Sequence, residues 1–227
     1  SLTSFAVSKD ESRYILTGIL FIVTDKKLSL VATDGRRLAV VNKDIPKPGG
    51  FTRKVIVPIK AVAELLKILK DEGDVKILFG ENQIAFEFDE TLLITRLIEG
   101  DYPNYEQVIP KSTQEKLRIS KDSFCAAIKR ASLFTTPDSQ SIKLDVLKNK
   151  IVISKVSHDG GESREELDCS YGGEDLTLGF NPNYLMDALK NIGEEEIIFE
   201  FAGADKRGVI RAEGNDYIYI VLPVRTE

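Results

Sequence analysis

A strand-like run, a proline and an amphipathic helix occur in the same order twice in this chain, roughly 125 residues apart. The first copy covers residues 55–70, with Pro58 where the helix is expected to begin. The second covers residues 176–192, where Asn181 can cap a helix and Pro182 can occupy its first position. A repeat of this length has the size of a small domain. The chain is therefore expected to fold as two related domains in tandem.

Further strand-like runs surround each copy of this motif. The first half predicts strands at 14–23, 28–32, 38–42, 75–79, 84–88 and 92–97. The second half predicts strands at 117–119, 142–147, 151–156, 165–171, 197–201, 209–212 and 217–222, together with a helix at 120–134. The first half lacks that opening strand and helix, apart from a possible helix end at 2–7. We therefore expect an α+β fold with domains 1–110 and 111–227, the first truncated at its N-terminus.

The composition is that of an ordinary soluble globular protein, with 42% hydrophobic and 30% charged residues. The net charge of −5 argues against a uniformly basic nucleic-acid binder, although a local basic surface is still compatible with it. No apolar run approaches the roughly 18 to 20 residues that span a bilayer, and the N-terminus does not resemble a signal peptide, so a cytoplasmic protein without membrane contact is expected. Cys125 and Cys169 are too few for a disulfide framework or a four-ligand zinc site.

Catalytic motifs are not found in the sequence. There is no phosphate-binding glycine loop, no serine-hydrolase elbow and no Cys/His set with metal spacing. His158 is the only histidine, and a lone histidine before a turn is more often a surface residue than a catalyst. We predict a protein that is not an enzyme and needs no cofactor or metal. The alternative is an α+β enzyme that uses an inter-domain cleft, with Asp34, Arg37 or His158 as its polar groups.

A turn at Thr33, Asp34 and Gly35 is followed at once by Arg36 and Arg37 between two apolar runs. Asp and Gly are ordinary turn residues, but two adjacent guanidinium groups in apolar company are unusual. Neighbours on a strand point to opposite faces, so the two arginines cannot share one face. One of them is expected to form a polar rim beside an apolar pocket.

Two helices carry basic side chains away from their apolar faces. On helix 59–70 the basic face has Lys60, Lys67 and Lys70 with Ala63, and the apolar face has Val62, Leu65, Leu66 and Leu69. On helix 120–134, Lys129 and Arg130 lie off an apolar face of Phe124, Ala127, Ile128 and Ala131. Such stripes often serve only solubility. A sparse basic face also suits a protein that binds phosphate without reading bases.

Four strings in register resemble one family across nearly the whole chain. They run from Thr33 to Val40, from Gly100 to Tyr105, from Gly179 to Leu185 and from Val221 to Arg225. In this order and spacing they are similar to the bacterial DNA sliding clamp, the beta subunit of DNA polymerase III. The resemblance implies a DNA-clamp (processivity) fold of three domains, each with two helices packed on antiparallel sheets. It covers the second and third domains only.

The resemblance also implies partners and sites. The family encircles duplex DNA of any sequence as a homodimeric ring, and we expect no ring from this chain alone. It holds the DNA polymerase III catalytic subunit, the clamp loader and repair polymerases through linear peptides. The implied peptide groove comprises Leu16, Thr33, Gly35, Arg36, Arg37, Leu38, Pro103, Gln107, Val108, Asn181, Tyr184, Ile220, Leu222, Pro223, Val224 and Arg225. The implied DNA-facing residues are Tyr14, Lys60, Lys67, Lys129 and Arg130.

Two positions depart from the family pattern, and two other interpretations stay open. Gln107 stands where the best-known family member has arginine, and Arg36 stands where it has histidine, so the polar rim is expected to favour different peptide side chains. One alternative is a two-domain subunit of a trimeric clamp, and the other is a purely structural repeat protein. The truncated opening of the first repeat argues against the trimeric clamp, and a structural repeat protein would bind neither peptide nor DNA.

Overall fold

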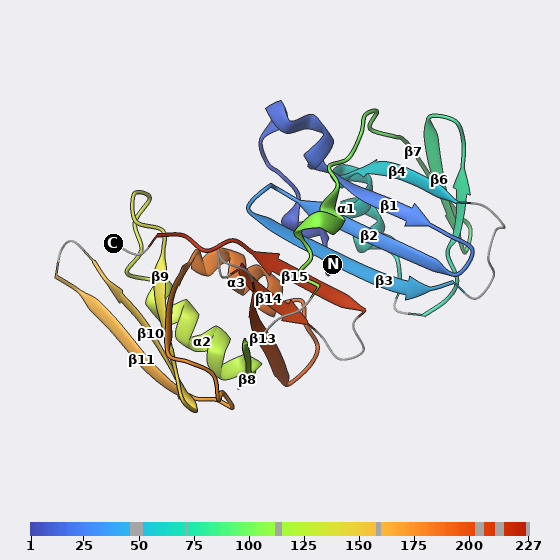
Figure 1. Cartoon of the computed structure of the whole chain (residues 1–227). Coiled ribbons are helices and arrows are strands. Elements are labelled where there is room, and N and C mark those ends of the chain that lie inside the picture. The colour runs from blue at the N-terminus through green and yellow to red at the C-terminus, as the bar shows by residue number, and fades with distance from the viewer. Residues whose placement is uncertain are drawn as a thin grey trace. The chain divides into compact units, whose positions relative to one another are not determined.

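The computed structural model describes residues 1–45, 52–70, 72–111, 115–157, 160–202, 207–211 and 216–225. The chain forms two compact units, Ser1–Tyr105 and Glu106–Glu227 (Figure 1). The sequence places the domain boundary near residue 110, and the chain divides into the two compact units between Tyr105 and Glu106. Both units combine helices with antiparallel sheets, so the predicted α+β class is confirmed.

The first unit begins with two 3-10 helices, η1 (Ser4–Ala6) and η2 (Glu11–Thr17), and contains one α-helix, α1 (Ile59–Ile68). One antiparallel sheet has the strand order β4-β1-β2-β3, made from β1 (Gly18–Val23), β2 (Lys27–Thr33), β3 (Arg37–Asp44) and β4 (Arg53–Pro58). A second sheet has the order β5-β6-β7, made from β5 (Lys76–Phe79), β6 (Gln83–Phe88) and β7 (Thr91–Arg96).

The core of the first unit lies between these two sheets. Every residue of β1 is buried, which is expected for an apolar strand paired on both edges. Phe21 of β1 meets Phe86 of β6 edge to face, with ring centroids 6.1 Å apart. On α1 the buried residues are Ala61 and Leu65, whereas Leu66 is 47% exposed. The apolar face predicted for this helix is therefore only partly buried.

The second unit contains the strand and helix that open its repeat, β8 (Glu115–Ser120) and α2 (Lys121–Ser132). Its first sheet has the order β11-β10-β9-β12, made from β9 (Ile142–Leu147), β10 (Lys150–Val156), β11 (Glu162–Asp168) and β12 (Leu176–Phe180). After α3 (Pro182–Leu189), its second sheet has the order β15-β14-β13-β8, with β13 (Glu196–Ala202), β14 (Arg207–Arg211) and β15 (Tyr217–Val221).

Local signals in the sequence fix both helices of the second unit. The Ser120 side chain accepts a hydrogen bond from the backbone of α2, and Asn181 caps α3 with Pro182 in its first turn, as predicted. The helices pack side by side (Figure 1), and the predicted apolar face of α2 is fully buried. In the core, Phe199 contacts the rings of Phe124, Phe180 and Phe201. Position 208 requires glycine, because an added Cβ would lie 2.6 Å from the Phe199 ring.

Several predicted boundaries move in the structure. The strand expected from residue 14 begins at Gly18, because Asp10 caps a 3-10 segment through the backbone N–H of Ser12. Helix α1 ends at Ile68, two residues before the expected end, where Leu69 adopts an extended conformation. The possible helix end at 2–7 is the 3-10 turn η1. No helix among the described residues is long and apolar enough to span a membrane.

Candidate functional site

The turn between β2 and β3 is built from its own side chains. Gly35 has a φ of +87°, a left-handed conformation that favours glycine. The Asp34 Oδ1 atom accepts hydrogen bonds from the backbone N–H groups of Arg36, at 2.9 Å, and Arg37, at 3.1 Å. The Thr33 hydroxyl donates to the Arg37 carbonyl at 2.6 Å and accepts from the Gly35 N–H at 3.0 Å. The turn is therefore held in one conformation by short-range bonds.

Arg37 points into the first unit and Arg36 points out. The Arg37 side chain is 6% exposed, and its Nε donates to Asp34 Oδ2 at 3.0 Å. Its Nη2 donates to the Phe5 carbonyl at 2.7 Å, and the guanidinium lies 5.6 Å from the centroid of the Phe5 ring. The sequence-based expectation that the arginines take opposite faces is confirmed. Arg36 is the exposed one, so it is the arginine that can form a rim.

Two residues that the sequence did not single out complete the turn. The Arg13 Nη1 atom donates to the Asp34 carbonyl at 2.9 Å, and the Thr33 N–H donates to the Tyr102 hydroxyl oxygen at 3.2 Å. Burial raises the pKa of the Tyr102 hydroxyl. Tyr102 lies in one of the four family-like strings. Arg13 carried no signal other than its place beside Tyr14.

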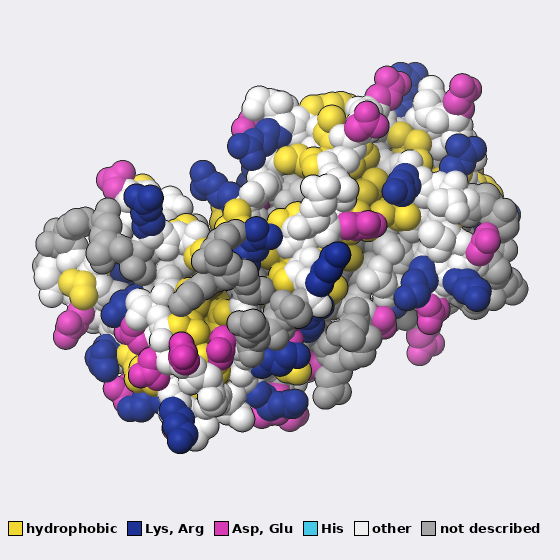
Figure 2. Space-filling view, in the orientation of Figure 1, with side chains coloured by type: hydrophobic (Ala, Val, Ile, Leu, Met, Phe, Trp, Pro, Cys, Tyr) yellow, Lys and Arg dark blue, Asp and Glu magenta, His cyan; other side chains and the backbone are white. Residues whose placement is uncertain are grey.

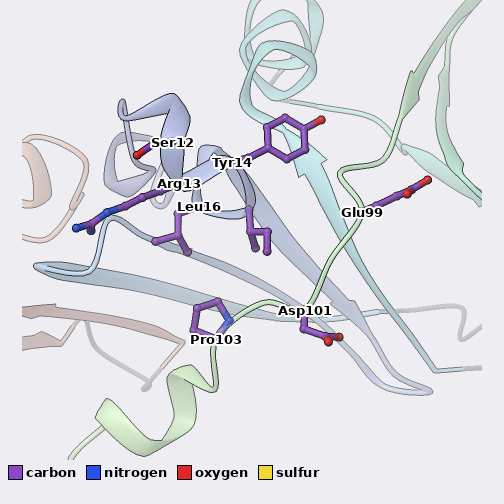
Figure 3. A pocket seen from close by; sticks show the side chains of 8 residues that line it. Ser12, Arg13, Tyr14, Leu16, Glu99, Asp101 and Pro103 are labelled. Atoms are coloured by element: carbon purple, nitrogen blue, oxygen red, sulfur yellow. The ribbon is translucent and has the colours of Figure 1, made fainter.

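A cavity of about 430 Å³ in the first unit contains two of the expected groove residues, Leu16 and Pro103 (Figure 3). Its wall is formed by residues 12–16 of η2 on one side, and by Glu99, Asp101 and Pro103 from the segment after β7 on the other. In Figure 3 the Leu16 side chain is directed toward Pro103. The remaining groove residues of this unit are Thr33, Gly35, Arg36, Arg37 and the buried Leu38, which lie in or directly after the turn.

The other expected groove residues lie in the second unit, at the start of α3 and in the last segment of the chain. Asn181 is 8% exposed, and its Oδ1 accepts from the Asn183 N–H at 2.9 Å. The carbonyl of Tyr184 accepts the Tyr219 hydroxyl at 2.8 Å, which ties α3 to β15. Ile220 is buried in β15.

Beyond β15, the chain continues past β12. Leu222 and Pro223 are half-buried, whereas Val224 and Arg225 are exposed. The Val224 N–H donates to the Gly179 carbonyl at 2.9 Å, which fixes this segment against β12. Gln107 and Val108 lie in η3 (Tyr105–Val108), where Gln107 is exposed and the Val108 carbonyl accepts from Arg207 at 3.3 Å.

The expected DNA-facing residues differ in how much of their charge is already paired. Lys60 and Lys129 are exposed and have no ion pair with any residue that the structure describes. Lys67 forms an ion pair with Glu64 at 2.7 Å. Arg130 forms a bidentate ion pair with Glu165, through Nε at 2.7 Å and Nη2 at 2.8 Å. The hydrogen bond from Arg130 lowers the pKa of the Glu165 carboxyl. Lys60 and Lys129 are therefore the cations more available to a phosphate.

Tyr14 and Lys60 come together in the first unit. Tyr14 is 60% exposed on η2, and with Lys60 it lines a second cavity of about 870 Å³. Lys9 lines the same cavity. In Figure 2, basic side chains are interspersed with acidic ones over the visible face rather than gathered in one patch. Any attraction for phosphate must therefore come from local groups such as these.

Little in the described part of the chain resembles a catalytic centre. His158 lies outside the described residues. Within the described ranges, no group of three or more His, Cys, Asp or Glu residues is placed to hold a metal ion. Asp34 and Arg37, the other two polar groups of the enzyme alternative, are bound to each other and mostly buried.

Comparison with known proteins identifies the family. Residues 1–104 match the family model described as the DNA polymerase III beta subunit, central domain, and residues 106–225 match its C-terminal domain. Among curated proteins, the beta sliding clamp of Chlamydia pneumoniae is 34% identical over 98% of this chain and 61% of the relative. The beta sliding clamp of Staphylococcus aureus is 37% identical over 99% of this chain and 60% of the relative. The chain thus spans about 60% of the length of these relatives.

Solved structures give the same result. The DNA polymerase sliding clamp of Bacillus subtilis superposes with a TM-score of 0.94 at 34% identity, covering 100% of this chain and 61% of that one. The DNA polymerase III subunit beta of Pseudomonas aeruginosa gives 0.93 at 31% identity, covering 98% and 62%. The chain belongs to the DNA polymerase III beta subunit family, the beta sliding clamps, and contains the central and C-terminal domains of that family.

Proposed function

We propose that this chain is part of a processivity factor that encircles duplex DNA and tethers the replicative polymerase. The observation that carries the proposal is the consecutive match of its two compact units to the central and C-terminal domains of the beta subunit. A central domain followed by a C-terminal domain favours this interpretation over a two-domain subunit of a trimeric clamp. The encircling ring, a homodimer, is proposed for a chain of the relatives' full length. Its place of action is the bacterial cytoplasm, with the chromosome.

The proposed mechanism is binding without catalysis. Partner proteins, namely the polymerase catalytic subunit, the clamp loader and repair polymerases, insert short linear peptides into a groove. In the first unit, Leu16 and Pro103 offer apolar contacts beside a rigid turn that presents Arg36. In the second unit, Leu222 and Pro223 offer apolar contacts on a segment fixed to β12. A few apolar anchors of about 1.5 to 3 kcal/mol each support micromolar, exchangeable binding.

Replacing Leu222 by alanine tests the peptide site. A labelled peptide from the C-terminus of the organism's DNA polymerase III catalytic subunit is titrated into the chain by fluorescence anisotropy. We expect Leu222→Ala to weaken binding by about tenfold or more, because an apolar anchor loses its contact area. Leu133→Ala is the matched control, since Leu133 is 77% exposed at the end of α2 and outside the proposed groove. Unchanged affinity of Leu222→Ala would contradict the groove, and absence of binding by the unaltered chain would contradict the function.

Removing the unpaired lysines tests contact with DNA. The double variant Lys60→Gln, Lys129→Gln is compared with Lys26→Gln, Lys148→Gln, which removes the same charge from exposed strand turns. Binding of duplexes of unrelated sequence is measured between about 50 and 200 mM salt. If both lysines contact phosphates, the first variant should lower the slope of log affinity against log salt by about two, equally for every sequence. Equal slopes for the two double variants would show that Lys60 and Lys129 do not face the DNA.

A further inference from the structure

The cavity between η2 and the segment after β7 has an uneven distribution of charge. In Figure 3, Arg13 extends to one side, Glu99 and Asp101 lie on the other, and Leu16 and Pro103 lie between them. The Arg13 guanidinium is engaged by the Asp34 carbonyl at 2.9 Å and by Asp10 at 3.9 Å. Its charge is therefore directed toward the turn and away from the two carboxylates.

Glu99 and Asp101 are available for a ligand. Both are exposed, and neither forms an ion pair with a residue that the structure describes. The segment that carries them is held by its neighbours: the Ile98 N–H donates to the Ile56 carbonyl, and Ile15 packs against Gly100, where an added Cβ would lie 2.8 Å from the Ile15 side chain. Two carboxylates that form no ion pair with a described residue thus project from a held backbone segment, on the side of the cavity opposite Arg13 (Figure 3).

We propose that this cavity is a charge-selecting subsite, in which Glu99 and Asp101 pair with a lysine or arginine close to the apolar anchor of a partner peptide. The inference rests on the proposed function, because it takes Leu16 and Pro103 as part of the peptide site. A cavity of about 430 Å³ accommodates only a few residues of extended chain at about 3.3 Å each. The cationic residue therefore lies within about three positions of the anchor residue.

The expected preference is modest, because exposed ion pairs are weak and screened by salt. A peptide with lysines beside its apolar anchor should bind about three- to fivefold more tightly than one with glutamates at low salt. At about 0.5 M salt the ratio should fall below about twofold. Because the whole chain carries a net charge of −5, a general attraction for cationic peptides must be separated from a local one.

The polymerase C-terminal peptide is made with two lysines or two glutamates added at its amino end, and separately at its carboxyl end. Each peptide is titrated into three proteins. They are the unaltered chain, the double variant Glu99→Gln/Asp101→Asn, and the control double variant Asp25→Asn/Glu90→Gln. The control removes the same charge from two exposed turns. Asp25 lies between β1 and β2, and Glu90 lies between β6 and β7. We expect the first variant to abolish the lysine preference at one end of the peptide and the control to retain it.

The outcomes separate the two claims. Equal binding of lysine and glutamate peptides to the unaltered chain would overturn the subsite while leaving the peptide groove intact. A lysine preference that both double variants reduce equally would also overturn it, because the attraction would then come from net charge. If none of the peptides binds, including the one with no added residues, the proposed function itself fails and the subsite fails with it.

Discussion

A chain carrying Phe199→Ala is expected to lose about 3 to 5 kcal/mol from the free energy of unfolding of its second unit. The Phe199 side chain is fully buried, and its ring centroid lies 4.8 Å from Phe201, 5.7 Å from Phe180 and 6.0 Å from Phe124. These rings come from β13, β12 and α2, so one truncation removes contacts from a helix and both sheets. A rigid, close-packed interior collapses only partly around such a cavity.

Denaturant unfolding and hydrogen exchange by mass spectrometry measure this loss and locate it. Exchange should accelerate in peptides covering α2, β12 and β13, whose rings contact Phe199. Leu133→Ala is the control, and it should change stability by no more than about 0.5 kcal/mol because that side chain is exposed. A loss below about 1 kcal/mol for Phe199→Ala would mean that the site is not the packed core described here.

The sequence predicted most helices and strands because their signals are local. Alternating or continuous apolar runs identify the strands, and Ser120 and Asn181 with Pro182 mark where α2 and α3 begin. The strand expected from residue 14 was wrong for a local reason as well. Tyr14 and its neighbours read as the start of an apolar run, but Asp10 caps a 3-10 segment that continues to Thr17.

The details of the turn could not be predicted, since its partners are distant in sequence. Alternation along a strand shows that only one of Arg36 and Arg37 points inward, but the choice depends on the carbonyl of Phe5, 32 residues away. The same holds for Tyr102, which is 69 residues from Thr33, and for Arg13, which is 21 residues from Asp34. Pattern and spacing therefore locate the turn, while only the folded backbone shows which side chains stabilise it.

Removing the Asp34 carboxylate is expected to cost about 3 to 5 kcal/mol of stability in the first unit, because it removes one member of a buried ion pair. In Asp34→Ala the Arg37 guanidinium, 6% exposed, loses the carboxylate oxygen that lies 3.0 Å from its Nε. The backbone N–H groups of Arg36 and Arg37 lose their acceptor at the same time.

The pair can be separated from its surroundings by a double-mutant cycle. Asp34→Ala, Arg37→Met should be clearly more stable than Asp34→Ala alone, because it removes both members of the buried ion pair rather than only one. Asp25→Ala, which alters an exposed carboxylate in the β1–β2 turn, is the control and should have little effect. Hydrogen exchange should accelerate in β2, β3 and η1, the elements that the turn and Arg37 join. If the double variant were as unstable as Asp34→Ala alone, the stabilisation would come from the backbone bonds of the turn rather than from the buried ion pair.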